Sequence, residues 1–169
     1  ATGQTCMAGS RVLVQRSAYD EFAAFIAERG ARLIAGDPLD PASQLGPVAS
    51  RAQLLRVLGH LQAAHDDRLE ALTGGRRMDR TGFFVEPTVF GDVSNESRLA
   101  RNEVFGPVVV LMRFDDEDDA VRLANDTEYG LAAGVWTADV KRAHRMVSRV
   151  RAGTVWVNNY RVLGHTQPF

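Results

Sequence analysis

The chain of 169 residues carries 20 Lys and Arg against 21 Asp and Glu, and 45% of its residues are hydrophobic. The net charge of −1 argues against a nucleic-acid-binding module, which normally carries a basic surface. No run of about 18 apolar residues is present, so no membrane span is expected. The single cysteine excludes an internal disulfide and a multi-cysteine metal site, and a reducing, cytoplasmic location is expected.

Short apolar strands alternate with amphipathic helices along the chain. This alternation predicts an α/β fold, with a mostly parallel open sheet and helices on both faces. Residues 11–15 are expected to form the first strand, and Ser17 to cap a helix that stops near Gly36. Residues 36–47 are rich in turn-forming residues and are expected to lie at the surface. A second helix is predicted to follow Ser50.

The second half of the chain continues the alternation. The expected elements are an extended segment at 83–90, a strand covered on both faces at 108–114, a helix whose N-terminus is the acidic run 115–119, a strand at 131–136, a helix capped by Asp139 and a last strand at 153–158. Three strand–helix–strand connections of this kind predict a parallel sheet with right-handed crossovers.

Three segments carry residues that are candidates for catalysis or ligand binding. Small residues surround Cys6, and a thiol at the start of a helix feels the positive end of the helix dipole, which favours the nucleophilic thiolate. Glu103 and Phe105 lie on a turn just before the strand at 108–114. Residues 156–169 run from the end of the last expected strand into the segment that follows it. In parallel α/β sheets, ligands bind at the C-terminal ends of the strands.

Each of these segments also has an ordinary structural interpretation. A lone cysteine is most often a small buried hydrophobe, Glu103 alone would be a surface carboxylate, and Phe105 alone would be a core aromatic. No His-x-x-His or Cys/His spacing is present, so no metal site is expected.

Taken together, the segments resemble the NAD(P)-dependent aldehyde dehydrogenase superfamily over essentially the whole chain. The strings that carry the resemblance are Gly-Gln-x-Cys-x-Ala-x-Ser-Arg at 3–11, FFVEPTVFGDV at 83–93, Glu-x-Phe-Gly-Pro at 103–107, Tyr-Gly-Leu-Ala-Ala at 129–133 and Gly-Thr-Val-Trp-Val-Asn at 153–158. The resemblance implies oxidation of a small aldehyde to a carboxylic acid, with hydride transfer to NAD or NADP.

The resemblance also implies roles for individual residues. Cys6 would be the nucleophile that forms a thiohemiacetal and then a thioester, and its backbone N–H would donate to the oxyanion. Glu103 would bind the nicotinamide ribose, and Phe105 would pack near the nicotinamide. The side chains assigned to the aldehyde pocket are Gln4, Thr5, Met7 and Phe169, with Asn158 in support of the site. Arg161 is a candidate contact for an anionic aldehyde, with a solvent-exposed arginine as the alternative.

The resemblance covers only one part of the family's subunit. Residues 1–169 are therefore expected to be the catalytic domain truncated at both ends, with the coenzyme-binding domain and the oligomerisation tail absent. NAD or NADP would bind through that absent domain, the full-length form would be a homo-oligomer, and the isolated fragment would be inactive. Two alternatives stay open: a cysteine-dependent hydrolase or acyltransferase that pairs Cys6 with a histidine, and a non-catalytic interaction fragment.

Overall fold

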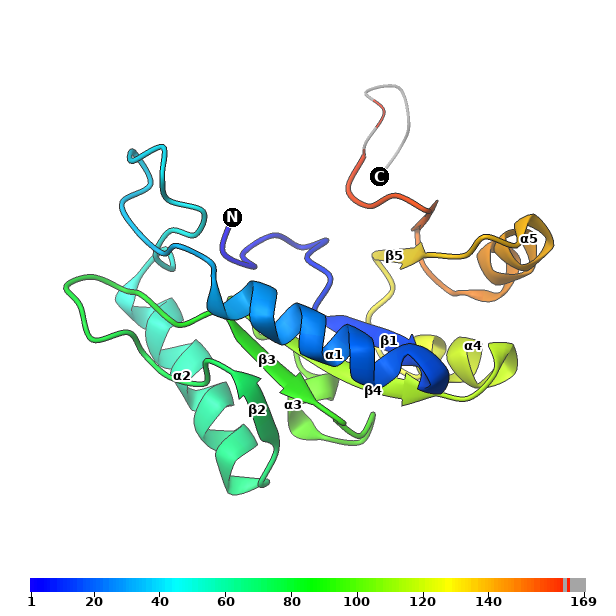
Figure 1. Ribbon diagram of the computed structural model, residues 1–169, viewed down its shortest axis with the longest axis horizontal. Coiled ribbons are helices and arrows are strands. Elements are labelled where there is room, and N and C mark those ends of the chain that lie inside the picture. Colours follow the sequence, from blue (N-terminus) through cyan, green and yellow to red (C-terminus); the bar gives the residue numbers. More distant parts are fainter. Residues whose placement is uncertain (163, 165–169) are drawn as a thin grey trace. The chain divides into compact units, whose positions relative to one another are not determined.

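The computed structural model describes residues 1–162 and 164, and the chain divides into two compact units, Ala1–Arg113 and Phe114–Phe169. The elements that begin in the first unit are β1 (Arg11–Gln15), α1 (Arg16–Ala31), α2 (Arg51–Asp66), β2 (Glu70–Thr73), β3 (Thr88–Gly91), α3 (Arg98–Arg101) and β4 (Val108–Phe114). Their strands form one sheet in the order β1-β4-β3-β2 (Figure 1). Strands β3 and β4 run parallel, with Thr88 opposite Val108, whereas β2 pairs with β3 antiparallel.

Helices cover both faces of this four-stranded sheet. Side chains of successive strand residues point to opposite faces, so β4 contributes to two separate cores. Val110 and Met112 pack with residues of α2 and α3, and Leu111 packs with Tyr19 and Ala23 of α1. The predicted α/β architecture, and the prediction that residues 108–114 form a strand buried on both sides, are confirmed.

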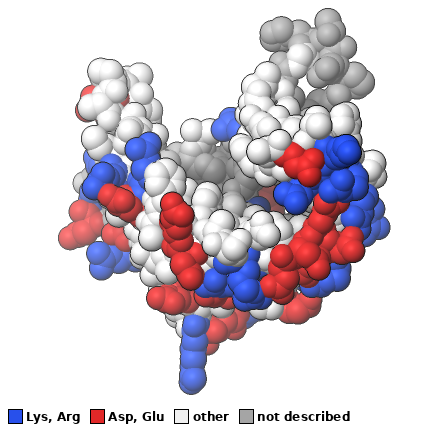
Figure 2. Space-filling view, turned by 45° about the vertical axis from the view of Figure 1, so that its right-hand side comes forward, with Lys and Arg blue, Asp and Glu red and all other residues white. Residues whose placement is uncertain are grey.

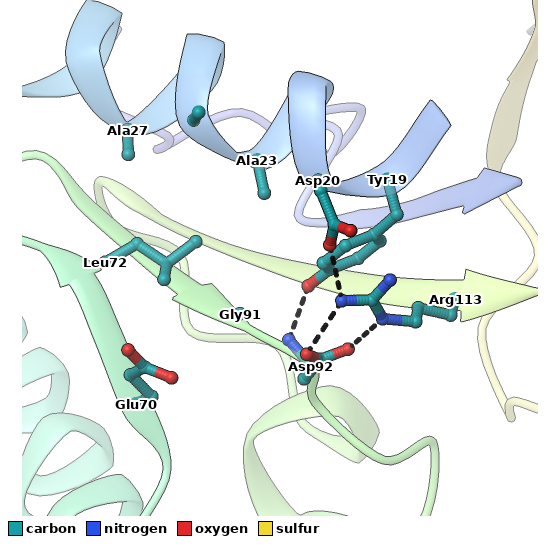
Figure 3. A pocket seen from close by; sticks show the side chains of 10 residues that line it. Tyr19, Asp20, Ala23, Ala27, Glu70, Leu72, Gly91, Asp92 and Arg113 are labelled. Carbon is teal, nitrogen blue, oxygen red and sulfur yellow. Dashed lines mark hydrogen bonds and ion pairs between the residues drawn. The ribbon is translucent and has the colours of Figure 1, made fainter. Parts of the chain in front are cut away.

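A network around Arg113 ties α1 to the ends of β3 and β4 (Figure 3). The Arg113 guanidinium lies 3.7 Å from the centre of the Tyr19 ring and donates to Asp92 and, at 2.9 Å, to Asp20. Asp92 donates its backbone N–H to the Tyr19 hydroxyl. Burial raises the pKa of the Tyr19 hydroxyl above its ordinary value of 10.

The limits of α1 differ from those predicted. The helix follows β1 directly, with Gln15 at the cap position and no side-chain cap, so Ser17 lies inside the helix. It ends at Ala31 rather than near Gly36. The reason is that Ile34 uses its backbone for another partner: its carbonyl accepts from Gln44 and Leu45, and its N–H donates to the Gln44 side chain.

Helix α2 begins where the sequence predicts. The Ser50 hydroxyl accepts the backbone N–H of Gln53 at 3.1 Å, the standard N-cap bond. The edge strand β2 that follows was not predicted, because its four residues carry no clear alternation and only its pairing with β3 makes it a strand.

The second unit contains α4 (Glu117–Asn125), β5 (Ala132–Val135), α5 (Val140–Arg149) and β6 (Thr154–Val157). Strands β5 and β6 pair in parallel and form a separate two-stranded sheet. Asp116 caps α4 through a carboxylate that accepts one backbone N–H, and Asp139 caps α5 through a carboxylate that accepts two. The interpretation of the acidic run as a helix N-terminus is thus confirmed.

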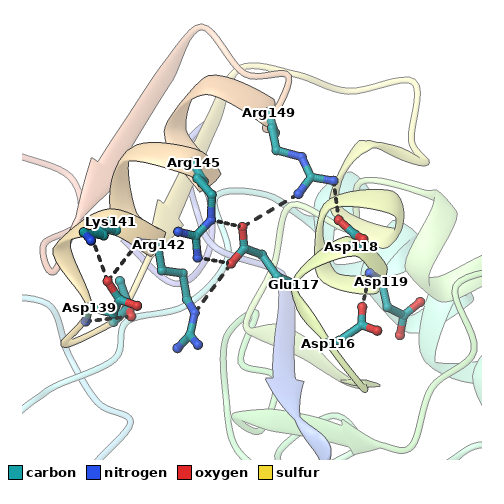
Figure 4. Close-up of polar contacts among 10 residues, drawn as sticks. Asp116, Glu117, Asp118, Asp119, Asp139, Lys141, Arg142, Arg145 and Arg149 are labelled. Carbon is teal, nitrogen blue, oxygen red and sulfur yellow. Dashed lines mark hydrogen bonds and ion pairs between the residues drawn. The ribbon is translucent and has the colours of Figure 1, made fainter.

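Ion pairs join the two helices of this unit. Both carboxylate oxygens of Glu117 accept from Arg145, at 2.8 and 2.7 Å, and Arg142 and Arg149 lie within 3.6 and 3.7 Å of the same carboxylate (Figure 4). On the face drawn in Figure 2, acidic and basic side chains are interspersed. Among residues 1–162 and 164, no helix combines the length and the apolar character that crossing a membrane demands.

Candidate active site

Cys6 is exposed and lies in a short segment with two turns, residues 2–8, which we call the thiol turn. The second of these turns is closed by a hydrogen bond of 2.9 Å from the Ala8 N–H to the Thr5 carbonyl. The interpretation of Cys6 as a buried hydrophobe is therefore wrong. The expected helix start at Cys6 is wrong as well, because the first helix begins at Arg16.

Two side chains fix the thiol turn to the loop that precedes α2. The Thr2 hydroxyl donates to the Gly46 carbonyl at 3.1 Å, and the Gln4 side-chain carbonyl accepts the Ala49 N–H at 2.7 Å. Gln4 and Met7 are half-buried on either side of the exposed Cys6. The thiol is thus presented by a segment that two hydrogen bonds between neutral groups anchor.

Gly3 brings a second segment against the thiol turn. Gly3 adopts a φ of +70°, and a Cβ at this position would lie 1.9 Å from the Gly106 carbonyl oxygen. Only a residue without a side chain allows this approach of two backbones. Gly106 belongs to residues 102–107, which we call the acidic loop and which carry Glu103 and Phe105. The fold therefore brings these two predicted segments side by side.

The acidic loop is held in an unusual backbone conformation. Phe105 has a φ of +54°, which costs a residue with a side chain about 1–2 kcal/mol. The Gln53 side-chain amide donates to the carbonyl of Phe105 at 2.8 Å and to that of Val104 at 3.2 Å. Glu103 is exposed and Phe105 is half-buried, so the loop presents a carboxylate and an aromatic ring at its surface.

The other predicted residues fall in several places. The Thr5 hydroxyl is buried, and none of residues 1–162 and 164 offers it a hydrogen bond. In the second unit, Asn158 makes two hydrogen bonds of 2.9 Å with the backbone of Thr137, and Arg161 is exposed. Phe169 lies outside the described residues. The assignments of all these side chains to an aldehyde pocket stay predictions.

Sequence reasoning missed Gln53 and the contact of Gly3 with Gly106. Gln53 stands three residues after the Ser50 cap, the spacing of a capping box, in which the glutamine would reach back to the cap N–H. The structure shows only the serine half of that box, and the glutamine side chain turns to the acidic loop instead. The spacing of Ser50 and Gln53 indicated a helix start and gave no sign that Gln53 contacts the acidic loop.

The first unit contains two histidines, His60 and His65. His65 lies within hydrogen-bond distance, 3.1 Å, of the Gly75 carbonyl, and burial lowers the pKa of His60. Neither is hydrogen-bonded to Cys6, so within residues 1–113 nothing supports a Cys–His pair. Among the residues that the structure describes, no group of three or more His, Cys, Asp or Glu side chains is arranged to hold a metal ion.

The fold and the site define an α/β protein that exposes a candidate nucleophilic thiol beside an acidic, aromatic loop. The chain belongs to the aldehyde dehydrogenase family, whose model matches residues 1–169. It is 45% identical to the betaine aldehyde dehydrogenases of Sinorhizobium fredii, over 172 residues, and of Cereibacter sphaeroides, over 169 residues. Both matches cover 100% of this chain and 35% of the relative, so the chain spans about a third of the length of these curated relatives.

Solved structures agree with this assignment. An aldehyde dehydrogenase of Bacillus cereus in complex with NAD+ matches 99% of this chain with a TM-score of 0.97 and 37% identity. The betaine aldehyde dehydrogenase of Staphylococcus aureus in complex with NAD+ also matches 99% of the chain, with a TM-score of 0.97 and 35% identity. In each case the matched region is 34% of the solved chain.

Proposed function

We propose that residues 1–169 are the nucleophile-bearing catalytic domain of an NAD(P)-dependent aldehyde dehydrogenase, which oxidises a small aldehyde to a carboxylic acid. The observation that carries this proposal is the exposed Cys6 on a turn that Gly3 holds against the acidic loop. The names of the relatives support the reaction, and betaine aldehyde is the first substrate to test. One S. aureus structure carries a cysteine modified by BME, which shows that a cysteine of that relative reacts with a small molecule.

The proposed reaction begins at the sulfur. The Cys6 thiolate adds to the aldehyde carbon, and the tetrahedral thiohemiacetal places negative charge on the former carbonyl oxygen, where the Cys6 N–H donates. The coenzyme supplies a hydride acceptor, and loss of hydride converts the thiohemiacetal into a thioester. Water then cleaves the thioester, which releases the acid and restores the thiol.

The residues of the acidic loop suit one end of such a coenzyme. An ionised carboxylate only accepts hydrogen bonds, and ribose hydroxyls donate them, so the exposed Glu103 fits a sugar diol. The half-buried Phe105 ring offers a flat apolar surface beside it. The part of the protein that this chain does not span is proposed to hold the general base, the second oxyanion donor and the remainder of the coenzyme site. It is also proposed to hold the oligomerisation tail of a homo-oligomer.

The test uses the full-length protein with betaine aldehyde and with NAD+ or NADP+. We expect coenzyme reduction in the parent, and a loss of at least about 1000-fold in kcat for Cys6→Ser. Coenzyme affinity and the thermal midpoint of Cys6→Ser should match the parent, because serine keeps the size of the side chain on an exposed turn. Reduction of neither coenzyme with a panel of small aldehydes, or full activity in Cys6→Ser, would contradict the proposal.

The proposal that residues 1–169 need further parts of the protein for activity has its own test. Residues 1–169 produced alone should not oxidise aldehydes, because a thiol without its base and coenzyme domain lacks two parts of the proposed reaction. Turnover by this isolated chain, measured as NADH or NADPH formation, would show that residues 1–169 are sufficient.

A further inference from the structure

The first turn of α2 lies between the two segments of the candidate site. On one side, Ala49, just before the Ser50 cap, donates its N–H to Gln4, two residues before Cys6. On the other side, Gln53 donates its side-chain amide to the carbonyls of Val104 and Phe105. One helix start therefore contacts both the segment that carries the thiol and the loop that carries Glu103.

The acidic loop needs such support. Val104 is buried and Phe105 follows it with a positive φ, a conformation that a residue with a side chain does not keep without external contacts. The backbone N–H of Val108 donates to the Gly106 carbonyl at 2.8 Å, which closes the far end of the loop. The two carbonyls before Gly106 are the ones that Gln53 holds.

We infer that Gln53 is a positioning residue: its amide holds the Val104 and Phe105 carbonyls, and thereby sets the direction in which Glu103 and Phe105 face the coenzyme. The inference rests on the proposed function, since it assigns Gln53 to the coenzyme side of that site. A glutamine suits this task because one primary amide has two N–H donors, one for each carbonyl. A glutamate of the same size would offer two acceptors, and methionine would offer neither donor.

A matched control lies nine residues further along the same helix. Gln62 is exposed, and its side-chain amide donates to Asp66 at 2.9 Å. Gln53→Met and Gln62→Met thus remove the same chemical group from α2, one beside the acidic loop and one on the outer surface. Gln53→Glu serves as the second variant if Gln53→Met does not fold.

The experiment measures two quantities on the full-length protein. Hydrogen exchange of the amides of residues 103–106 and 108 should quicken in Gln53→Met and stay at the parent rate in Gln62→Met. The KM for the coenzyme should rise about tenfold in Gln53→Met, while the KM for the aldehyde changes less than about twofold. A merely destabilised fold would instead lower kcat through loss of active protein and leave the coenzyme KM unchanged.

The outcomes separate the two proposals. If the parent is active, the positioning role alone is overturned by either of two results. One is loop exchange in Gln53→Met within about twofold of that in Gln62→Met, and the other is a coenzyme KM in Gln53→Met within about twofold of that in Gln62→Met. An inactive parent overturns the proposed function, and with it the coenzyme role of Gln53. Faster loop exchange together with a raised coenzyme KM supports the inference.

Discussion

The candidate site in the first unit and the helix pair in the second unit are held by different kinds of contact. Around the site, the contacts are between neutral groups. The Gln4 side chain accepts a hydrogen bond from the Ala49 backbone, the Gln53 side chain donates to the backbone of the acidic loop, and the backbone of Gly3 lies against that of Gly106. In the second unit, α4 and α5 are joined by the Glu117 cluster, which is Glu117 with Arg142, Arg145 and Arg149 (Figure 4).

The difference lies in what each kind of contact fixes. A hydrogen bond from a side chain to a backbone carbonyl fixes the path of the main chain and does not depend on ionisation. Exposed ion pairs are screened by salt, cost side-chain entropy and contribute little each. The site geometry is thus expected to resist changes of pH and ionic strength that loosen the helix pair.

Among the contacts of these two regions, the one between Gly3 and Gly106 should give the largest effect when it is disrupted by Gly3→Ala. The new Cβ would lie 1.9 Å from the Gly106 oxygen, so the thiol turn and the acidic loop must move apart. We expect kcat of the full-length protein to fall about 100-fold, the effect of misplacing reacting groups by about 1 Å. The control is Gly59→Ala in α2, where an added Cβ meets nothing within 4 Å, and steady-state kinetics should show it at parent activity. Equal activity of Gly3→Ala and Gly59→Ala would show that the contact of Gly3 with Gly106 is not needed for catalysis.

Tyr19→Phe tests a neutral contact away from the site. The phenylalanine ring keeps the packing under Arg113 but leaves the Asp92 N–H without its acceptor, since the Tyr19 hydroxyl is the group that accepts it. We expect a loss of about 1 kcal/mol in the free energy of unfolding, measured by urea denaturation. An unchanged midpoint would mean that water replaces the hydroxyl at no cost.

Glu117→Gln tests the charged contacts and should have a smaller effect than Tyr19→Phe. The substitution keeps the size of the side chain but leaves Arg142, Arg145 and Arg149 close together without the carboxylate between them. Amides of α4 and α5 should exchange faster, whereas Glu128→Gln, an exposed site in the same unit, should match the parent. If both variants behave alike, the Glu117 cluster contributes nothing measurable.

Acid should reproduce the effect of Glu117→Gln in the parent, and this is the smallest change expected. Hydrogen bonds from Arg145 hold the pKa of Glu117 below its ordinary value of 4.5. Because the folded pKa is the lower one, the stabilisation is fully present above about pH 5 and is lost as pH falls through the folded pKa. In the parent, exchange of the α4 and α5 amides, corrected for its intrinsic pH dependence, should quicken as the pH falls through the lowered pKa of Glu117. In Glu117→Gln this step should be weaker. A step of equal size in both would assign it to other carboxylates, such as Asp139, whose pKa is also lowered, there by backbone N–H donors.

Much of the fold was predictable because its signals are local. Ser50 and Asp139 cap helices through hydroxyl or carboxylate groups two or three residues from the N–H groups that they bind. The strand at β4 is a continuous apolar run, and its two buried faces follow from the alternation of side chains. The end of α1 was missed because Ile34 pairs with residues that lie ten positions further along the chain.

The sequence by itself determined the α/β class and the family strings, and it predicted which residues carry reactive or coenzyme-binding chemistry. Only the tertiary structure decided that Cys6 is exposed on a turn, that Gly3 meets Gly106 and that Gln53 reaches the acidic loop. The physical reason is the range of the contacts. A cap bonds within its own turn, whereas the Gln53 amide and the Phe105 carbonyl are 52 residues apart in sequence and meet at 2.8 Å because the sheet and α2 pack together.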